Sequence, residues 1–174
     1  MAEKIAIKRL TQANVYLNGA TLLGRVAEIE LPDIKTKQLE HKALGMIGDL
    51  EFPSGFEKLE GKLKWASVEA DVLVQVFNPF KAAQLMVRSS LESYTNLGRV
   101  TEDPVVIYLD VMFKVAQNPN FKPNESVEME AEYNAMYMKQ VIGGQDIVEI
   151  DMLSNTFKVG GVDLLTNYRS NLGG

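Results

Sequence analysis

The chain has 174 residues, of which 46% are apolar, 18 are lysine or arginine and 23 are aspartate or glutamate, so its net charge is −5. This length and composition predict one soluble globular domain over residues 1–174. The absence of cysteine excludes disulfides and thiolate metal sites. The acidic balance argues against a general DNA-binding protein, because phosphate binding depends on clustered lysine and arginine. It is compatible with a protein that encloses DNA while repelling it.

The first half of the chain is predicted to consist mostly of strands. Residues 14–19 form a β-prone run that ends in Asn-Gly, a strong hairpin turn signal. A second strand is expected over residues 22–31, and Pro32 stops it. Residues 59–65 alternate between apolar and charged side chains, as a half-buried strand does. Leu59, Leu63 and Trp65 share the face that we expect to be buried, and Glu60, Lys62 and Lys64 share the other.

The segment from about residue 35 to residue 55 is predicted to be an extended irregular loop. It contains glycines at 45, 48 and 55 together with Pro53, and these residues interrupt regular structure. A loop of this length in a compact domain usually has a function.

A helix is predicted over residues 67–78. Ser67 can cap its N-terminus, and Pro79 ends it. The valines at 72 and 76 lie one turn apart on an apolar stripe, although with the valine at 74 they also fit an alternating strand.

The second half of the chain returns to strands. The predicted strands cover residues 84–91, 105–115, 126–142 and 147–152, with a Gly-Gly turn at 143–144 between the last two. A second short helix is predicted over residues 162–170. The pattern as a whole predicts a mainly β fold.

No pattern of catalytic or metal-binding residues emerges from the sequence. His41 is the only histidine, whereas a zinc site usually needs several histidine or cysteine ligands. Glu128, Glu130 and Glu132 are spaced by two, so in a strand their side chains share one face, roughly 7 Å apart. Carboxylate pairs can hydrolyse glycosides, but such a row is more often a solvated sheet face. We therefore predict no catalytic residue, no cofactor and no metal ion.

The most specific part of the sequence is its C-terminal segment. Residues 148–151 read Val-Glu-Ile-Asp, residues 158–165 read Lys-Val-Gly-Gly-Val-Asp-Leu-Leu, and residues 169–173 read Arg-Ser-Asn-Leu-Gly. This order resembles the C-terminus of the major tail tube family of contractile-tailed phages, in which a VEID run precedes a KV-x-GVD-x-L segment and a final R-x-N-x-G. The same family includes the tube of R-type pyocins, which are headless tails.

Three earlier stretches agree with this resemblance. Residues 14–19 resemble the first strand of the family, and Leu31-Pro32 followed by Gly45-Met46-Ile47-Gly48 resembles its LP turn and GM-x-G loop. Trp65 stands where the family has a tryptophan after that loop. The resemblance therefore spans nearly the whole chain.

The resemblance implies a β-sandwich or barrel-like subunit with one flanking helix, and no catalytic residues. Six subunits would close a ring, and the rings would stack into a hollow tube in which strands of all subunits form one continuous barrel. The tube would conduct DNA in a phage, or ions in a pyocin-like particle. Its implied partners are a contractile sheath, baseplate and tail terminator proteins, and a tape measure protein with DNA in the lumen of a phage. It would be assembled in the cytoplasm of the host bacterium and reside in the virion tail or tail-like particle.

Three groups of residues are candidates for contacts in such an assembly. The predicted loop carries apolar side chains that should not stay in water, so they are expected to pack on adjacent subunits: Leu44, Met46, Ile47, Leu50 and Phe52. Glu128, Glu130 and Glu132 are expected to line the lumen as an acidic wall, or alternatively to face outward. Asp163 and an exposed Arg169 are expected to contact the sheath, or their segment closes the core of its own subunit.

Other functions remain compatible with parts of the sequence. A type VI secretion tube would share the architecture. A monomeric β-barrel that binds a small ligand would have an apolar pocket, and a glycosidase would use the glutamate row at residues 128–132. Phage tail and headless particle are not separable from the chain alone.

Overall fold

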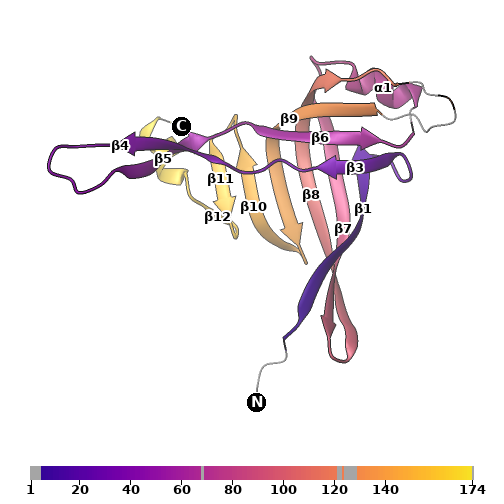
Figure 1. The fold of residues 1–174 in the computed structure, drawn as a ribbon, viewed down its shortest axis with the longest axis horizontal. Helices are drawn as coiled ribbons and strands as arrows, with labels where there is room; N and C mark the ends of the chain where they lie inside the picture. Colours follow the sequence, from indigo (N-terminus) through magenta and orange to yellow (C-terminus); the bar gives the residue numbers. More distant parts are fainter. Residues whose placement is uncertain (1–4, 68, 121–122, 124–128, 174) are drawn as a thin grey trace.

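The computed structural model describes residues 5–67, 69–120, 123 and 129–173. Within these residues the fold is mainly β (Figure 1), as predicted. The N-terminal half contains β1 (Ile7–Leu17), β2 (Ala20–Thr21), β3 (Val26–Glu30), β4 (Thr36–His41), β5 (Leu50–Phe56), β6 (Leu59–Trp65) and α1 (Ala70–Val76). The C-terminal half contains β7 (Ala83–Thr95), β8 (Gly98–Ala116), β9 (Met129–Ile142), β10 (Gln145–Asp151), β11 (Thr156–Val159), β12 (Val162–Asp163) and α2 (Thr166–Asn171).

A single antiparallel sheet holds most of the described strands together. Its order is β12-β11-β10-β9-β8-β7-β1-β2, and β3 joins it through β6, which pairs with β9. In Figure 1, β3 and β6 run across the direction of β7 and β8. Buried side chains from these crossing strands, including Leu63, Leu85 and Leu109, belong to one core cluster. The sheet therefore folds over itself into a sandwich.

Strand β9 makes this folding possible because its two edges are used differently. One edge pairs with β8 along most of its length. The other edge pairs with β6 over residues 129–135 and with β10 over residues 137–142. Met136 lies between the two pairings, where the register with β8 shifts. The buried positions of β9 change phase there, from Ala135 to Met138, so one strand contributes to both layers.

The local signals in the sequence correspond to the structure where they are strongest. Asn18 and Gly19 have positive φ values of 48° and 84° and connect β1 to β2, as the hairpin signal predicts. In β6, Leu59, Leu63 and Trp65 are buried while Glu60 is exposed.

Both helices are shorter than predicted. Helix α1 begins at Ala70 and ends at Val76. Val72 and Val76 are buried while Val74 is 72% exposed, which a helical turn explains, whereas the alternative strand would place all three on one face. Helix α2 begins at Thr166, after β12 has already paired with β11. None of the helices in the described residues is long and apolar enough to cross a membrane.

The predicted irregular loop is the largest local difference between sequence and structure. Most of residues 35–55 belongs to an antiparallel hairpin of β4 and β5, in which Leu39 pairs with Phe52 and His41 with Leu50. We call this hairpin, residues 36–56, the arm. Figure 1 shows it extending away from the rest of the sheet. The glycines that suggested a loop lie at its tip and at a bend, where Gly45 and Gly55 have positive φ.

Gly61 of β6 lies where other parts of the core leave no room for a side chain. A Cβ atom at this position would lie 2.4 Å from the Tyr133 ring and 2.5 Å from the Glu30 carbonyl oxygen. The Tyr133 hydroxyl donates a hydrogen bond to that same carbonyl at 2.9 Å, and burial raises the pKa of Tyr133. The ring and the carbonyl therefore occupy the space that any larger residue would need.

We predict that Gly61→Ala lowers the free energy of unfolding by about 1–3 kcal/mol, as overpacking of a core does. Gly48→Ala is the matched control, because a Cβ there meets no atom within 4 Å. Urea unfolding of the two variants and the wild type, at a concentration where all are monomeric, measures the difference. Equal midpoints for Gly61→Ala and the wild type would contradict the packing described here.

Candidate assembly surfaces

The arm carries apolar side chains that the subunit itself does not cover. All five residues predicted to contact other subunits lie on it and are exposed: Leu44, Met46, Ile47, Leu50 and Phe52. Leu44 and Ile47 at the tip are 106% and 109% exposed, so they make essentially no packing contact within the subunit. His41 is also exposed and lies edge-on to Phe52, with ring centroids 6.4 Å apart.

The base of the arm is fixed to the sheet by aromatic packing. Phe56 lies against Phe157 of β11, with ring centroids 4.7 Å apart. The Glu57 N–H donates a hydrogen bond to the Lys35 carbonyl at 2.8 Å and closes the hairpin. The arm is therefore anchored at one end while its tip is exposed.

A second apolar projection was not found from the sequence. The N-terminal half of β1 pairs with the end of β7, which pairs in turn with the start of β8, and this ribbon projects from the sheet in Figure 1. Its exposed apolar residues are Ile7, Leu10, Leu97 and Val100. The predicted strand over residues 84–91 ends before β7 does, and the predicted strand over residues 105–115 begins after β8 does. Residues 92–104 are mostly polar and lack the alternation that marks a half-buried strand.

The structure places two of the three glutamates of the predicted row on one sheet face. Glu130 and Glu132 are both partly exposed on β9, and Glu128 lies outside the described residues. Lys62 of β6 lies 3.2 Å from Glu130 and 3.4 Å from Glu132. Lys114 of β8 lies 3.3 Å from Glu132. We call these residues, with Glu60, the lysine–glutamate face.

The lysines change the net charge that the row of glutamates would give to this face of the sheet. The ion pair with Lys114 is the main reason that the pKa of Glu132 is lowered, with Lys62 adding to it. The pKa of Lys62 is raised, chiefly by Glu130. Glu60, Glu130 and Glu132 each lie next to a lysine, so this face is close to neutral rather than strongly acidic.

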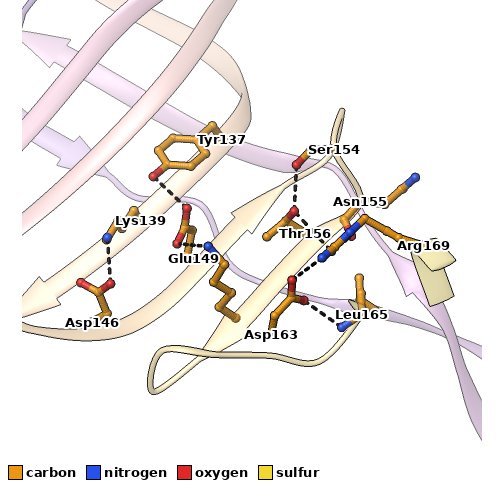
Figure 2. A network of polar contacts seen from close by, with 11 residues as sticks. Tyr137, Lys139, Asp146, Glu149, Ser154, Asn155, Thr156, Asp163, Leu165 and Arg169 are labelled. Carbon is orange, nitrogen blue, oxygen red and sulfur yellow. Dashed lines mark hydrogen bonds and ion pairs between the residues drawn. The ribbon is translucent and has the colours of Figure 1, made fainter. Parts of the chain in front are cut away.

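The C-terminal candidates Asp163 and Arg169 bind one another. Figure 2 shows the Arg169 guanidinium between the Asp163 carboxylate, at 2.5 Å, and the Asn155 carbonyl oxygen, to which it donates at 3.0 Å. Asp163 also accepts a hydrogen bond from the Leu165 N–H at 2.9 Å. Arg169 lowers the pKa of Asp163. The expectation that Arg169 is exposed is wrong, because only 28% of its side chain is accessible.

A ladder of polar pairs connects this ion pair to the centre of the sheet. Glu149 of β10 accepts hydrogen bonds from Tyr137 at 3.4 Å and from Lys158 at 3.1 Å, and Lys139 lies 2.8 Å from Asp146 (Figure 2). Burial, with Glu149 as a lesser cause, raises the pKa of Tyr137 to about 12. These pairs link β9, β10 and β11 on one face of the sheet.

The ion pair fixes a helix that the core does not hold. Helix α2 has no buried residue, so the alternative in which it closes its own core is not what the structure shows. Exposed apolar side chains lie on α2 and on the segments before and after it. We call them the C-terminal patch: Leu153, Val162, Leu164, Tyr168 and Leu172. Arg169 and Asp163 therefore hold α2 next to these side chains.

The exposed surfaces of the subunit define the class of protein to which it belongs. In the described part of the chain, the features that stand out are two projecting apolar hairpins, a neutralised sheet face and an exposed C-terminal helix. Large exposed apolar surfaces on a soluble subunit mark contacts with other subunits. The protein is therefore a building block of a larger assembly.

Comparison with known proteins identifies the assembly. The family model described as phage tail tube protein FII matches residues 7–173. The tail tube protein of Escherichia phage P2 is 23% identical over 168 residues, which cover 95% of this chain and 97% of that protein. The chain belongs to this family of tail tube proteins of contractile-tailed phages, and it is a structural tube subunit.

Solved structures share the fold. A sheath/tube terminator of the PVC extracellular contractile injection system, in its extended state, superposes with a TM-score of 0.55 at 12% identity and covers 75% of this chain and 92% of its own. A chain of the sheath–tube complex of the same system has a TM-score of 0.54 at 10% identity, with 75% and 87% covered.

We predict that Asp163→Asn releases helix α2, and that amide hydrogen exchange over residues 166–171 becomes several-fold faster. Because the pKa of Asp163 is lowered in the folded state, its contribution is present above the unfolded value, about 3.9. It is lost as the pH falls through the folded value. Because the intrinsic exchange of an amide itself slows as the pH falls, protection factors are compared. Acidification should lower the protection factors of residues 166–171 in the wild type and change them much less in the variant.

Asp146→Asn is the control for this experiment. It removes the pair with Lys139, which lies on the same face of the sheet but does not include a residue of α2. Exchange over residues 166–171 should be unchanged in this variant. Equal exchange in wild type and Asp163→Asn would show that the ion pair does not hold the helix.

Proposed function

We propose that six copies of this protein close into a ring, and that the rings stack into the hollow inner tube of a contractile tail. The observation that carries the proposal is the arm, whose tip has two fully exposed apolar side chains and no packing partner in the described subunit. The P2 relative is a tail tube protein, and the PVC structures contain a tube with its sheath. The tube guides DNA out of a phage, or conducts ions in a headless particle.

Sheet edges support closure into a ring. Strand β2 pairs with Tyr16 and Leu17, and the Leu22 N–H donates to the Val15 carbonyl at 2.7 Å, so within the described residues the outer edge of β1 is open along residues 7–14. A long open edge invites pairing with another chain. Pairing with a strand of the neighbouring copy would satisfy its backbone groups and continue the sheet around the ring, which removes the edges altogether.

We further propose that the lysine–glutamate face lines the channel and that the C-terminal patch meets the sheath. A wall of paired charges neither holds DNA by counterion release nor repels it strongly, so DNA can slide past. An apolar patch on an exposed helix suits a protein partner that surrounds the tube. Baseplate and terminator proteins would cap the two ends, a tape measure protein would fill the channel before DNA, and assembly would take place in the host cytoplasm.

Removing the tip of the arm tests the proposed assembly. Deletion of residues 43–50 should leave a folded monomer that does not form tubes, because contacts between subunits of an obligate assembly typically bury about 2,000 Å² or more. Negative-stain microscopy of concentrated wild type and variant measures tube formation, and circular dichroism confirms the fold of the variant. Tubes of normal length from the deletion variant would contradict a role of the arm in assembly.

Cysteine labelling tests which face is inside. The chain has no cysteine, so Glu132→Cys and Tyr168→Cys each introduce one thiol. A small maleimide should label both variants in assembled tubes, whereas a maleimide coupled to a protein too large for the channel should label only Tyr168→Cys. Monomers should react with both reagents at both positions, which is the control. Reaction of the large reagent with Glu132→Cys tubes would place the lysine–glutamate face outside.

A further inference from the structure

A groove separates two strand edges that have no partner within the described residues. The outer edge of β1 is open along residues 7–14, and β3 is paired along one edge, with β6. Between the two open edges lies a groove of about 540 Å³, lined by residues 12–15 of β1 and 26–29 of β3 and closed at one end by residues 22–24. We call it the edge groove. Unpaired N–H and C=O groups along a strand favour pairing with a further strand.

The lining of the edge groove suits a strand with one apolar face. Among the described residues that line it, Glu28 alone is charged, and its carboxylate lies 2.6 Å from the Lys64 ammonium group. Val26 and Ile29 are only partly buried, and Leu23 at the closed end is 73% exposed. A ligand recognised by charge would find no unpaired charge here, whereas an apolar strand face would cover these side chains.

The arm is a hairpin with one apolar face and one polar face. Leu39 and Phe52 form a cross-strand pair, and Leu50, two residues away on β5, shares their face. These three side chains are 62%, 52% and 46% exposed. Glu40 and Glu51 are paired on the opposite face. An isolated two-stranded hairpin is at best marginally stable in water, so the arm is expected to gain a further strand or a packing surface.

The arm also has backbone groups that are free to pair. Strands β4 and β5 form a sheet of two strands, so within the described residues the outer edge of each is open. Pro53 has no N–H and limits pairing at its own position. Residues 50–52 of β5, which precede it, are therefore the part of this edge that can pair with another strand.

The arm and the edge groove lie on opposite sides of the subunit. Strand β3 leads through residues 31–35 into β4, and β5 leads through residues 57–58 into β6, so the arm is the projecting half of one long ribbon. Its base packs on β11 near one end of the sheet, whereas the groove borders β1 near the other end. Figure 1 shows the arm extending away from β1 and β3. The arm therefore does not fill the groove of its own chain.

A ring brings these two sides together. Neighbours in a ring contact one another through unlike surfaces, so the arm side of one copy meets the groove side of the next. Strand β5 runs in the same direction as β6 in Figure 1, and β6 is antiparallel to β3. The β5 strand of one copy can therefore approach β3 of the next copy in antiparallel orientation.

We propose that the arm of one copy inserts into the edge groove of the adjacent copy, where β5 adds to the open edge of β3 and the apolar face of the arm covers the groove. The proposal rests on the proposed tube function and specifies the receptor for the arm. The contact continues the layer of β3 and β6 from one copy to the next, as pairing at the edge of β1 continues the other layer. It covers Leu39, Leu50 and Phe52 of one copy and Val26 and Ile29 of the other.

Crosslinking of two single-cysteine populations tests the contact. One population carries Glu51→Cys, on the polar face of β5, and the other carries Ala27→Cys, at an exposed position of β3 that lines the groove. Both positions lie outside the apolar contact, so negative-stain microscopy should show normal tubes. The mixed tubes are treated with a short bismaleimide. A dimer band that requires both populations is expected, at a yield at least tenfold above either population alone.

Phe80→Cys replaces Ala27→Cys in the matched control. Phe80 is 91% exposed and follows α1, which lies on the same side of the subunit as β1 in Figure 1. A neighbour that covers this side without entering the groove would reach it. With the arm in the groove, Phe80→Cys should give no dimer band with Glu51→Cys.

The outcomes separate the contact from the function. Tubes that form without a crosslink between Glu51→Cys and Ala27→Cys would overturn the contact while leaving the tube function intact. A band of equal or higher yield with Phe80→Cys would assign the arm to the surface of α1 and would also overturn it. If wild-type protein forms no tubes at all, the proposed function fails and the contact fails with it.

Discussion

Strand β9 is hydrogen-bonded to three other strands, and the two layers of the subunit meet because its second edge is shared between β6 and β10. Buried backbone groups must be paired, so a strand that leaves one layer has to find partners in the other. The bulge at Met136 turns the side chains by one position and lets Tyr133 and Met138 both face the core.

Cross-strand ion pairs set the character of the face that carries Glu130 and Glu132. Any net charge on a subunit of a sixfold ring recurs at every copy and sums to a large potential. Lys62 and Lys114 hold that charge small by placing ammonium groups within 3.4 Å of the carboxylates. Opposite charges on neighbouring strands also stabilise the sheet modestly. Local pairing thus serves the sheet and keeps the net charge of this face small, which would limit the potential in the ring that we propose.

Exposed apolar surface is the cost of building a subunit that must polymerise. Leu44, Ile47 and Leu97 remain in contact with solvent in the single chain, where they give no stability and favour association. A neighbouring subunit that binds only the folded state stabilises that state by mass action. The assembled state should therefore be considerably more stable than the monomer, with the arm and the ribbon supplying surfaces that the core does not need.

Local signals in the sequence determined much of the subunit. Alternation in residues 59–65 predicted which side chains of β6 are buried, Asn18-Gly19 predicted the first turn, and the C-terminal motif identified the family. The arm was mistaken for a loop, because Pro53 and Gly55 lie within β5 and because neither strand has a buried face, so that only their pairing with one another forms the hairpin. The ion pairs of Glu132 with Lys62 and Lys114, and the use of Arg169 to hold Asp163, arise between residues that only folding brings together. Periodicity and turn chemistry act over a few residues and can be read from the chain, whereas strand neighbours and charge partners depend on long-range pairing that only the tertiary structure decides.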